Sequence, residues 1–159
     1  MLCEIAKEVL KDNPDWKWII LGDGEDKEKL ESKIKEYNLQ GKLILKGKVS
    51  NVEDYYKDSS LYVMTSRFEG LPMTLLEAKS YKLPIVSFNC LTGPSEIVRN
   101  NINGFLIETG NVAAMVNKIG ILLSDINKRE DFSNKSNLDI EKFRLKPIVD
   151  KWENILINL

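Results

Sequence analysis

Residues 66–78 read Ser-Arg-Phe-Glu-Gly-Leu-Pro-Met-Thr-Leu-Leu-Glu-Ala, and they follow the apolar run Leu-Tyr-Val-Met at residues 61–64. The apolar run predicts a buried strand. Pro72 predicts the first position of a helix, because its missing N–H would have no partner there. The segment is therefore expected to run strand, loop, helix. The unpaired N–H groups in the first turn of that helix form a natural site for an anion.

Two carboxylates flank this predicted anion site, Glu69 in the loop and Glu77 inside the helix. Carboxylates repel a nearby phosphate unless they are aimed at hydroxyl groups beside it. A sugar nucleotide offers both features, phosphates for the helix end and ribose and hexose hydroxyls for the carboxylates. Taken singly, Glu77 is more simply an exposed helix residue near Lys79 and Lys82. Its combination with Glu69 and a Gly-Leu-Pro helix start favours the ligand-binding interpretation.

The rest of the chain alternates apolar runs with segments of helical periodicity. Strands are expected at residues 16–21, 42–46, 61–65, 84–88 and 105–107. Helices are expected at 2–11, 25–37, 50–56, 72–81, near 94, 111–123, 125–138 and 146–157. Strands that are apolar throughout predict a parallel sheet covered by helices on both faces. We therefore expect residues 1–159 to form one α/β domain, a doubly wound parallel sheet that binds its ligand at the carboxyl ends of the strands.

Composition narrows the classes of function. The chain has 159 residues, 24 acidic and 23 basic, and a net charge of −1, so the basic face that nucleic-acid binding requires is not expected. There is no histidine, the commonest general base and metal ligand. Cys3 and Cys90 lie far apart and have no metal-ligand spacing, which favours a reducing, cytoplasmic location and no metal or cofactor. No apolar run reaches the length of a membrane span.

Three further loops follow predicted strands. Gly22-Asp23-Gly24 lacks the third glycine of a dinucleotide motif, and its neighbouring acids would repel a pyrophosphate, so we interpret it as a tight turn. Gly47-Lys48-Val49 is, from the residues alone, better interpreted as a plain turn. Thr92-Gly93-Pro94 is a second loop-to-helix start, in which the glycine would let the backbone approach a ligand. For this third loop, an ordinary capped helix and a ligand-binding start are not separated by the sequence alone.

Residues 66–78 resemble the signature of retaining glycosyltransferases of the GT-B type, in which seven residues separate two glutamates, here Glu69 and Glu77. The likeness continues through LGDGEDKEKLE (21–31), LILKGKV (43–49), NCLTGPSEIV (89–98) and NINGFLIETGN (101–111). It covers only the C-terminal, donor-binding half of such an enzyme. In that half the domain usually opens with a strand and a basic residue pair. Neither is found here, so we expect the first strand of the Rossmann-like sheet to be missing.

The resemblance implies a role for each matched position. Glu69 would contact the donor sugar as the catalytic residue, and Glu77 would hydrogen-bond the ribose hydroxyls. The segment that holds sugar and phosphate through backbone amides would be Gly70, Leu71, Pro72, Met73 and Thr74, although Pro72 has no amide of its own. Residues that border the donor would be Gly22, Lys48 and Gly93. Arg67 is equally suited to pair with a phosphate or to form a salt bridge with a neighbouring acid.

The implied activity is transfer of a hexosyl unit from a nucleotide-diphosphate sugar to an acceptor hydroxyl in polysaccharide or glycolipid synthesis. As the donor, UDP-hexose is favoured over GDP-hexose. The partners implied are the sugar donor and an N-terminal acceptor-binding domain, with peripheral membrane association of the full enzyme. The isolated chain is expected to be inactive. The alternatives are a non-catalytic nucleotide-binding module and half of a GT-B epimerase or phosphorylase. The lack of histidine disfavours the epimerase.

Overall fold

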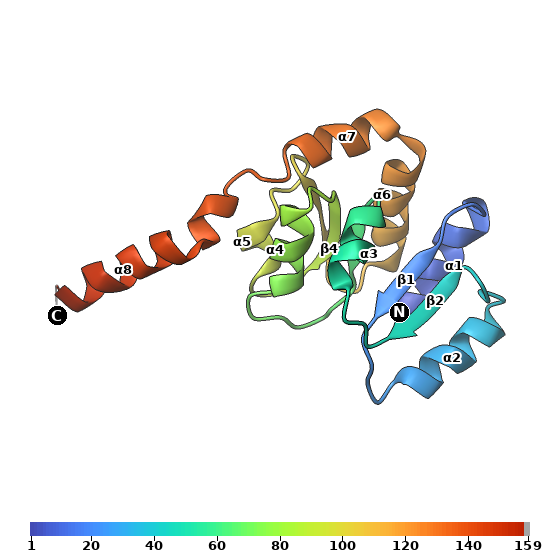
Figure 1. Cartoon of the computed structure of the whole chain (residues 1–159). Coiled ribbons are helices and arrows are strands. Elements are labelled where there is room, and N and C mark those ends of the chain that lie inside the picture. The colour runs from blue at the N-terminus through green and yellow to red at the C-terminus, as the bar shows by residue number, and fades with distance from the viewer. Residues whose placement is uncertain (158–159) are drawn as a thin grey trace.

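The computed structural model describes residues 1–157, along which helices and strands alternate (Figure 1). The strands are β1 (Trp18–Leu21), β2 (Leu43–Gly47), β3 (Tyr62–Met64), β4 (Ile85–Asn89) and β5 (Gly104–Glu108). The helices are α1 (Leu2–Asp12), α2 (Lys27–Glu36), α3 (Val52–Asp58), α4 (Met73–Ser80), α5 (Pro94–Ile97), α6 (Val112–Ser124), α7 (Ile126–Asn134) and α8 (Leu145–Ile157), with the 3-10 helix η1 at Ile140–Phe143. Every expected element is present, and only the ends are shifted.

The helix after β3 starts one residue later than predicted. Pro72 has an extended backbone (φ −72°, ψ 98°) and stands before the helix as its cap, so the first helical residue is Met73. The prediction that Pro72 occupies the first helical position is therefore wrong. The reason is local: the ring fixes φ but leaves ψ free, and here ψ takes the extended value.

All strand pairs are parallel, as expected, but in the described residues the strands form two sheets. One holds β1 and β2, with Trp18 opposite Leu43. The other has the order β3-β4-β5, with Val63 opposite Val86. The central strand β4 is buried on both sides along Ile85–Phe88, which explains why three of these four residues are apolar.

Helices cover both faces of the three-stranded sheet. On one face, Val86 and Phe88 of β4 join a core cluster with residues of α1, α6 and α7, among them Ile119. On the other face, Ile85 packs in a second cluster with residues of α3, α4 and α5, among them Leu75. The doubly wound arrangement is therefore confirmed. It leaves the carboxyl ends of the strands as the edge where loops meet.

Helix α1 connects the two sheets. Its residues Ile5 and Val9 belong to the cluster that covers β4 and β5. Its residues Cys3, Ala6 and Leu10 pack instead with Ile34 of α2 and Leu43 of β2. Helix α1 thus packs against both sheets and holds them next to each other, although no strand pairing joins the two sheets in the described residues.

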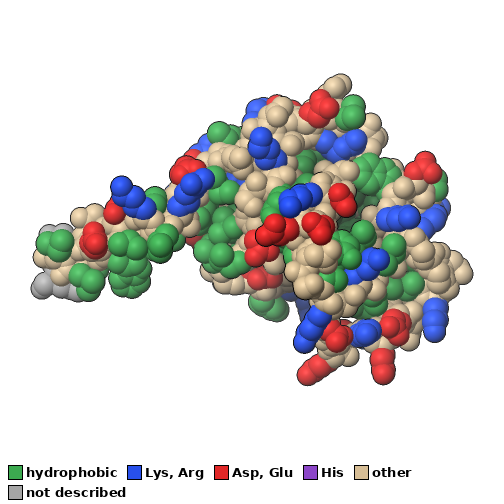
Figure 2. Space-filling model, viewed as in Figure 1, with side chains coloured by type: hydrophobic (Ala, Val, Ile, Leu, Met, Phe, Trp, Pro, Cys, Tyr) green, Lys and Arg blue, Asp and Glu red, His purple; other side chains and the backbone are tan. Residues whose placement is uncertain are grey.

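Helix α8 extends away from the rest of the molecule (Figure 1). Apolar side chains gather along one side of it (Figure 2). The exposed apolar residues of this helix are Leu145, Ile148, Val149, Trp152, Ile155, Leu156 and Ile157. Trp152 is 61% exposed and is not part of the core of the described residues.

Candidate functional site

The predicted site residues lie at the carboxyl edge of the two sheets. Gly22 follows β1 and Lys48 follows β2. The loop 65–72 follows β3, and the loop 90–93 follows β4. Parallel sheets bind ligands at this edge. The fold therefore brings segments separated by up to seventy residues to one side of the molecule.

The loops 65–72 and 90–93 are in direct contact, and we call them the paired loops. Gly93 has φ +94° and ψ −65°, a backbone conformation that favours glycine. A Cβ atom at this position would stand 2.2 Å from the carbonyl oxygen of Gly70 and 2.6 Å from Cδ of Pro72. Gly93 is therefore required for the close approach of the two loops. The sequence motif Thr-Gly-Pro has a structural reason that does not depend on a ligand.

Two side-chain hydrogen bonds add to this contact and fix the backbone around Glu69. The Thr92 hydroxyl donates to the carbonyl oxygen of Glu69 at 2.6 Å. The Cys90 thiol donates to the carbonyl oxygen of Ser66 at 3.0 Å. Burial raises the pKa of the Cys90 thiol, and the negative charge of Glu69 raises it further. The backbone of Glu69 is therefore held against the loop that follows β4.

The Glu77 carboxylate is held by a tyrosine that sequence analysis did not identify. The Tyr56 hydroxyl donates to Oε2 of Glu77 at 2.9 Å. The Tyr56 ring stacks on Tyr81, with centroids 5.3 Å apart, and lies 6.0 Å from the ring of Tyr62. Burial raises the pKa of Tyr56, and its hydrogen bond to Glu77 raises it further. Tyr56 thus stays protonated and directs one Glu77 oxygen, which leaves the other for a ligand hydroxyl.

The start of α4 carries unused backbone donors. Pro72 supplies no side-chain cap, and the first intrahelical bond runs from the Leu75 N–H to the Pro72 carbonyl at 3.0 Å. The N–H groups of Met73 and Thr74 come before that bond. Such groups carry the positive end of the helix dipole and suit an anion.

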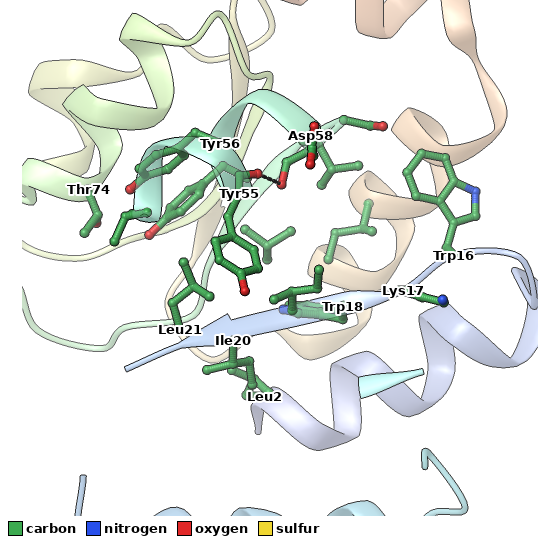
Figure 3. A pocket seen from close by; sticks show the side chains of 18 of the residues that line it. Leu2, Trp16, Lys17, Trp18, Ile20, Leu21, Tyr55, Tyr56, Asp58 and Thr74 are labelled. Carbon is green, nitrogen blue, oxygen red and sulfur yellow. Dashed lines mark hydrogen bonds between the residues drawn. The ribbon is translucent and has the colours of Figure 1, made fainter. Parts of the chain in front are cut away.

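A cavity of about 930 Å³ opens beside these residues. Among its lining residues are four that sequence analysis had assigned to the donor site, namely Gly22, Lys48, Thr74 and Glu77. Figure 3 shows Thr74 and Tyr56 at one end of this cavity and Trp16 at the other. A smaller hollow of about 230 Å³ is lined by Asp23, Gly24 and Lys48. The other predicted residues do not line the large cavity: Arg67, Glu69, Gly70, Leu71, Pro72, Met73 and Gly93 belong to the paired loops and the helix start that follows them.

Two cations are available near this edge. Arg67 and Lys48 are both exposed, and neither forms an ion pair with any residue in the part of the chain that the structure describes. The salt bridge considered for Arg67 is thus not formed among these residues. Within residues 1–157 no three cysteine or acidic side chains gather in a way that could hold a metal ion. Nor is any helix in this range long and apolar enough to pass through a membrane.

Sequence reasoning missed the residues that support the site. Tyr56 precedes Glu77 by 21 positions, and no local motif connects them. Thr92 and Cys90 lay within quoted motifs but had no predicted role of their own. Lys79 was named only as a neighbour of Glu77, yet it is 1% exposed, and its ammonium group donates to the carbonyl oxygen of Ile97 at 2.8 Å. The helical spacing of Lys79 from Leu75, its neighbour on the buried face, could have signalled this placement.

A model of the family described as glycosyl transferases group 1 matches residues 1–139. The chain belongs to this family. A glycosyltransferase of Haemophilus influenzae is 34% identical over 155 residues, which are 98% of this chain and 44% of that protein. The poly(ribitol-phosphate) alpha-N-acetylglucosaminyltransferase of Staphylococcus aureus is 34% identical over 156 residues, which are 98% of this chain and 32% of that protein. The chain therefore spans less than half the length of these curated members of the glycosyl transferases group 1 family.

Solved structures agree with this assignment. A complex of S. aureus TarM with UDP, Fondaparinux and alpha-GlcNAc-glycerol has a TM-score of 0.92 at 34% identity, over 96% of this chain and 31% of that one. The pneumococcal O-GlcNAc transferase GtfA with UDP and GlcNAc has a TM-score of 0.86 at 26% identity, over 99% of this chain and 32% of that one. The C-terminal domain of a glycosyl transferase group 1 protein from Francisella tularensis has a TM-score of 0.81 at 26% identity, over 91% of this chain and 78% of that one. The resemblance to the C-terminal half of a GT-B glycosyltransferase is confirmed.

Proposed function

We propose that this chain is the donor-binding half of a retaining glycosyltransferase that transfers a hexosyl unit from a nucleotide-diphosphate sugar, UDP-hexose first, to an acceptor hydroxyl in polysaccharide or glycolipid synthesis. The observation that carries the proposal is the Glu77 carboxylate. It is fixed by Tyr56, lines the large cavity and stands in the helix whose N-terminal amides are unused. The acceptor site belongs to the part of the enzyme outside these 159 residues.

Glu77 is assigned to the ribose of the donor. Its Oε2 accepts from Tyr56, so Oε1 is left to accept from a ribose hydroxyl. Gly22 and Lys48 line the same cavity and would border the nucleoside. Gly22 has φ +116° and no side chain, so it leaves open space at this point.

The diphosphate is assigned to the start of α4. The amides of Gly70, Leu71, Met73 and Thr74 would hold sugar and phosphate, and Arg67 would pair with a phosphate oxygen. Negative charge builds on the diphosphate as it leaves, and preorganised amides and cations stabilise that charge. This arrangement requires no metal ion. Glu69, whose backbone is fixed by Thr92, would contact the donor sugar.

The bound ligands of the structural relatives support a uridine nucleotide, since both the TarM and the GtfA complexes contain UDP. Both cysteines of this chain are free and buried, which suits a reducing compartment, and we place the enzyme in the cytoplasm, at the inner face of the membrane when its acceptor is a lipid.

Calorimetric titration with UDP, GDP and ADP tests the assignment of Glu77. We expect saturable binding of UDP, weakened about tenfold or more by Glu77→Gln, because one charged hydrogen bond is worth about 1.5–3 kcal/mol. Glu28→Gln is the matched control, since Glu28 is exposed on α2 and should leave the affinity unchanged. Equal affinities of the wild type and Glu77→Gln would contradict the proposed ribose contact.

An activity assay tests whether the donor-binding half requires the rest of the enzyme for sugar transfer. We expect residues 1–159 alone to transfer no sugar from UDP-hexose to an acceptor, because they hold only the donor side of the reaction. The same assay on a full-length enzyme that contains this half should give transfer, and Glu77→Gln should reduce it. Efficient transfer by the 159-residue chain would contradict the proposal.

A further inference from the structure

Helix α5 is a single turn that begins directly after Gly93 of the paired loops. The Glu96 N–H donates to the Gly93 carbonyl oxygen at 3.0 Å. The Val98 N–H donates to the Pro94 carbonyl oxygen at 2.8 Å. Four helical residues rise only about 6 Å, so the far end of this hydrogen-bonded turn lies close to the paired loops. Contacts that hold the far end of α5 therefore also set the position of Gly93 against Gly70.

Two lysine side chains hold the far end of α5. The ammonium group of Lys79, on α4, donates to the Ile97 carbonyl oxygen at 2.8 Å, and this hydrogen bond is buried. The ammonium group of Lys142, on η1, donates to the Glu96 carbonyl oxygen at 2.9 Å on the surface. Carbonyl groups in the last turn of a helix have no partner within the helix, and lysine side chains can bind them. The last two carbonyl groups of α5 are thus each bound by a cation.

Helices α4 and α5 lie side by side and are connected at two points (Figure 1). Before the start of α4, Gly70 and Pro72 contact Gly93. Near the end of α4, Lys79 donates to Ile97. A single contact between two helices allows rotation about it, whereas two separate contacts fix their relative orientation. The orientation of α5, and with it the position of Gly93, therefore depends on the hydrogen bond from Lys79.

Stability alone does not explain a lysine at position 79. Its side chain is 1% exposed, and burial lowers the pKa of Lys79 to about 8. Its neighbours on α4, Leu75 and Ala78, are fully buried apolar residues. A charged group loses its hydration on burial, a cost that an apolar residue of similar volume does not have. The ammonium group stands where α4 meets the end of α5, which indicates a role in placing α5.

We propose that Lys79 and Lys142 are positioning residues, which hold α5 and Gly93 so that the paired loops keep the arrangement that binds the donor diphosphate. The inference rests on the proposed function, in which the amide of Leu71 is one of those that hold sugar and phosphate. The Gly70 carbonyl that contacts Gly93 belongs to the same planar peptide unit as the Leu71 N–H. A displaced α5 therefore releases the peptide unit that directs this N–H, although neither lysine touches the donor.

Three variants separate the placement of α5 from general stability. Lys79→Met removes the buried donor and keeps an apolar side chain of similar volume. Lys142→Met removes a donor at the surface, so this variant keeps the fold. Ser136→Ala is the matched control, because the buried Ser136 hydroxyl donates to the carbonyl oxygens of Lys79 and Leu83, both at 3.3 Å and both outside α5. Urea unfolding at pH 7.5 verifies that each variant is folded.

Backbone amide resonances measured by NMR test the placement of α5 without any nucleotide. We expect the resonances of Gly70, Leu71 and Gly93 to shift in Lys79→Met. They should shift by less in Lys142→Met, because this variant releases the same helix end from the surface. In Ser136→Ala all three should keep their wild-type positions. Unchanged resonances in either lysine variant, or equal shifts in Ser136→Ala, would overturn the proposal.

Calorimetric titrations with UDP and with uridine test the effect on the donor site. We expect Lys79→Met to weaken UDP binding about tenfold, as for the loss of one hydrogen bond to a charged group, and Lys142→Met to weaken it by less. Uridine has no phosphate, so its affinity should be the same in all variants, and Ser136→Ala should change neither affinity. Equal losses for UDP and uridine would overturn the proposal. No UDP binding by the wild type would refute the proposed function instead, and the amide resonances would then decide the placement of α5.

Discussion

Replacing Gly93 by alanine tests the contact between the paired loops most directly. Two independent effects lower the free energy of unfolding of this variant. Alanine would have to adopt φ +94° and ψ −65°, a strained conformation that costs about 1–3 kcal/mol. Its Cβ would also stand 2.2 Å from the Gly70 carbonyl oxygen, so one loop must shift, at about 1–3 kcal/mol for overpacking.

The expected loss for Gly93→Ala is therefore about 2–6 kcal/mol, a large share of the roughly 5–15 kcal/mol that stabilises a typical domain. Urea unfolding followed by circular dichroism measures it, with the midpoint falling and the slope m unchanged. Gly110→Ala is the matched control. Gly110 has φ +88°, but its Cβ would meet nothing within 4 Å, so this variant has the backbone cost without the clash.

The difference between the two alanine variants isolates the clash. Should Gly93→Ala destabilise the chain no more than Gly110→Ala, the close approach of Gly70 and Gly93 would not contribute to stability, and the structural reason given for the Thr-Gly-Pro motif would be refuted. If UDP binds at the start of α4, the shifted loop in Gly93→Ala should also weaken UDP binding, whereas Gly110→Ala should not.

Tyr56→Phe removes the donor to Glu77 and should weaken UDP binding about fivefold in calorimetry, since one net hydrogen bond is worth about 1 kcal/mol. Tyr55→Phe, in the same cavity wall, should not. Burial lowers the pKa of Lys79 to about 8 from 10.5, so the unfolded state binds more protons between these values. Raising the pH from 7.5 to 10 should therefore stabilise the wild type relative to Lys79→Met, by roughly 2–3 kcal/mol in urea unfolding. If the difference in unfolding free energy between the wild type and Lys79→Met is the same at both pH values, the Lys79 amine is exposed to water and not buried.

The alternation of strands and helices was predictable because each element carries its own periodicity. The runs at residues 84–88 and 105–107 are apolar apart from Ser87, and both proved to be buried strands of a parallel sheet. The position of the site at the carboxyl edge followed from the same alternation. Strand pairing was harder to predict, because the separation of β1 from β3 into two sheets depends on tertiary packing and not on either strand's own sequence.

The residues that hold the site in place could not be predicted from local sequence patterns. Glu77 was found through its spacing from Glu69, but the Tyr56 hydroxyl that directs it comes from another helix, and tertiary packing alone brings the two together. The burial of Lys79 was also not predicted. A lysine is rarely buried, yet the Ile97 carbonyl compensates for its burial. The role of Gly93 as a contact point likewise depends on Gly70, which is 23 residues away.

Because α8 extends away from the rest of the molecule, the chain's three tryptophans fall into two groups that fluorescence can distinguish. Trp16 and Trp18 line the large cavity, whereas Trp152 lies on α8 and is 61% exposed. With the first two replaced by phenylalanine, fluorescence comes from the helix alone. Its emission then moves to shorter wavelength whenever an apolar surface covers α8 and stays unchanged when only the large cavity is filled. This helix therefore carries an intrinsic reporter of its own contacts.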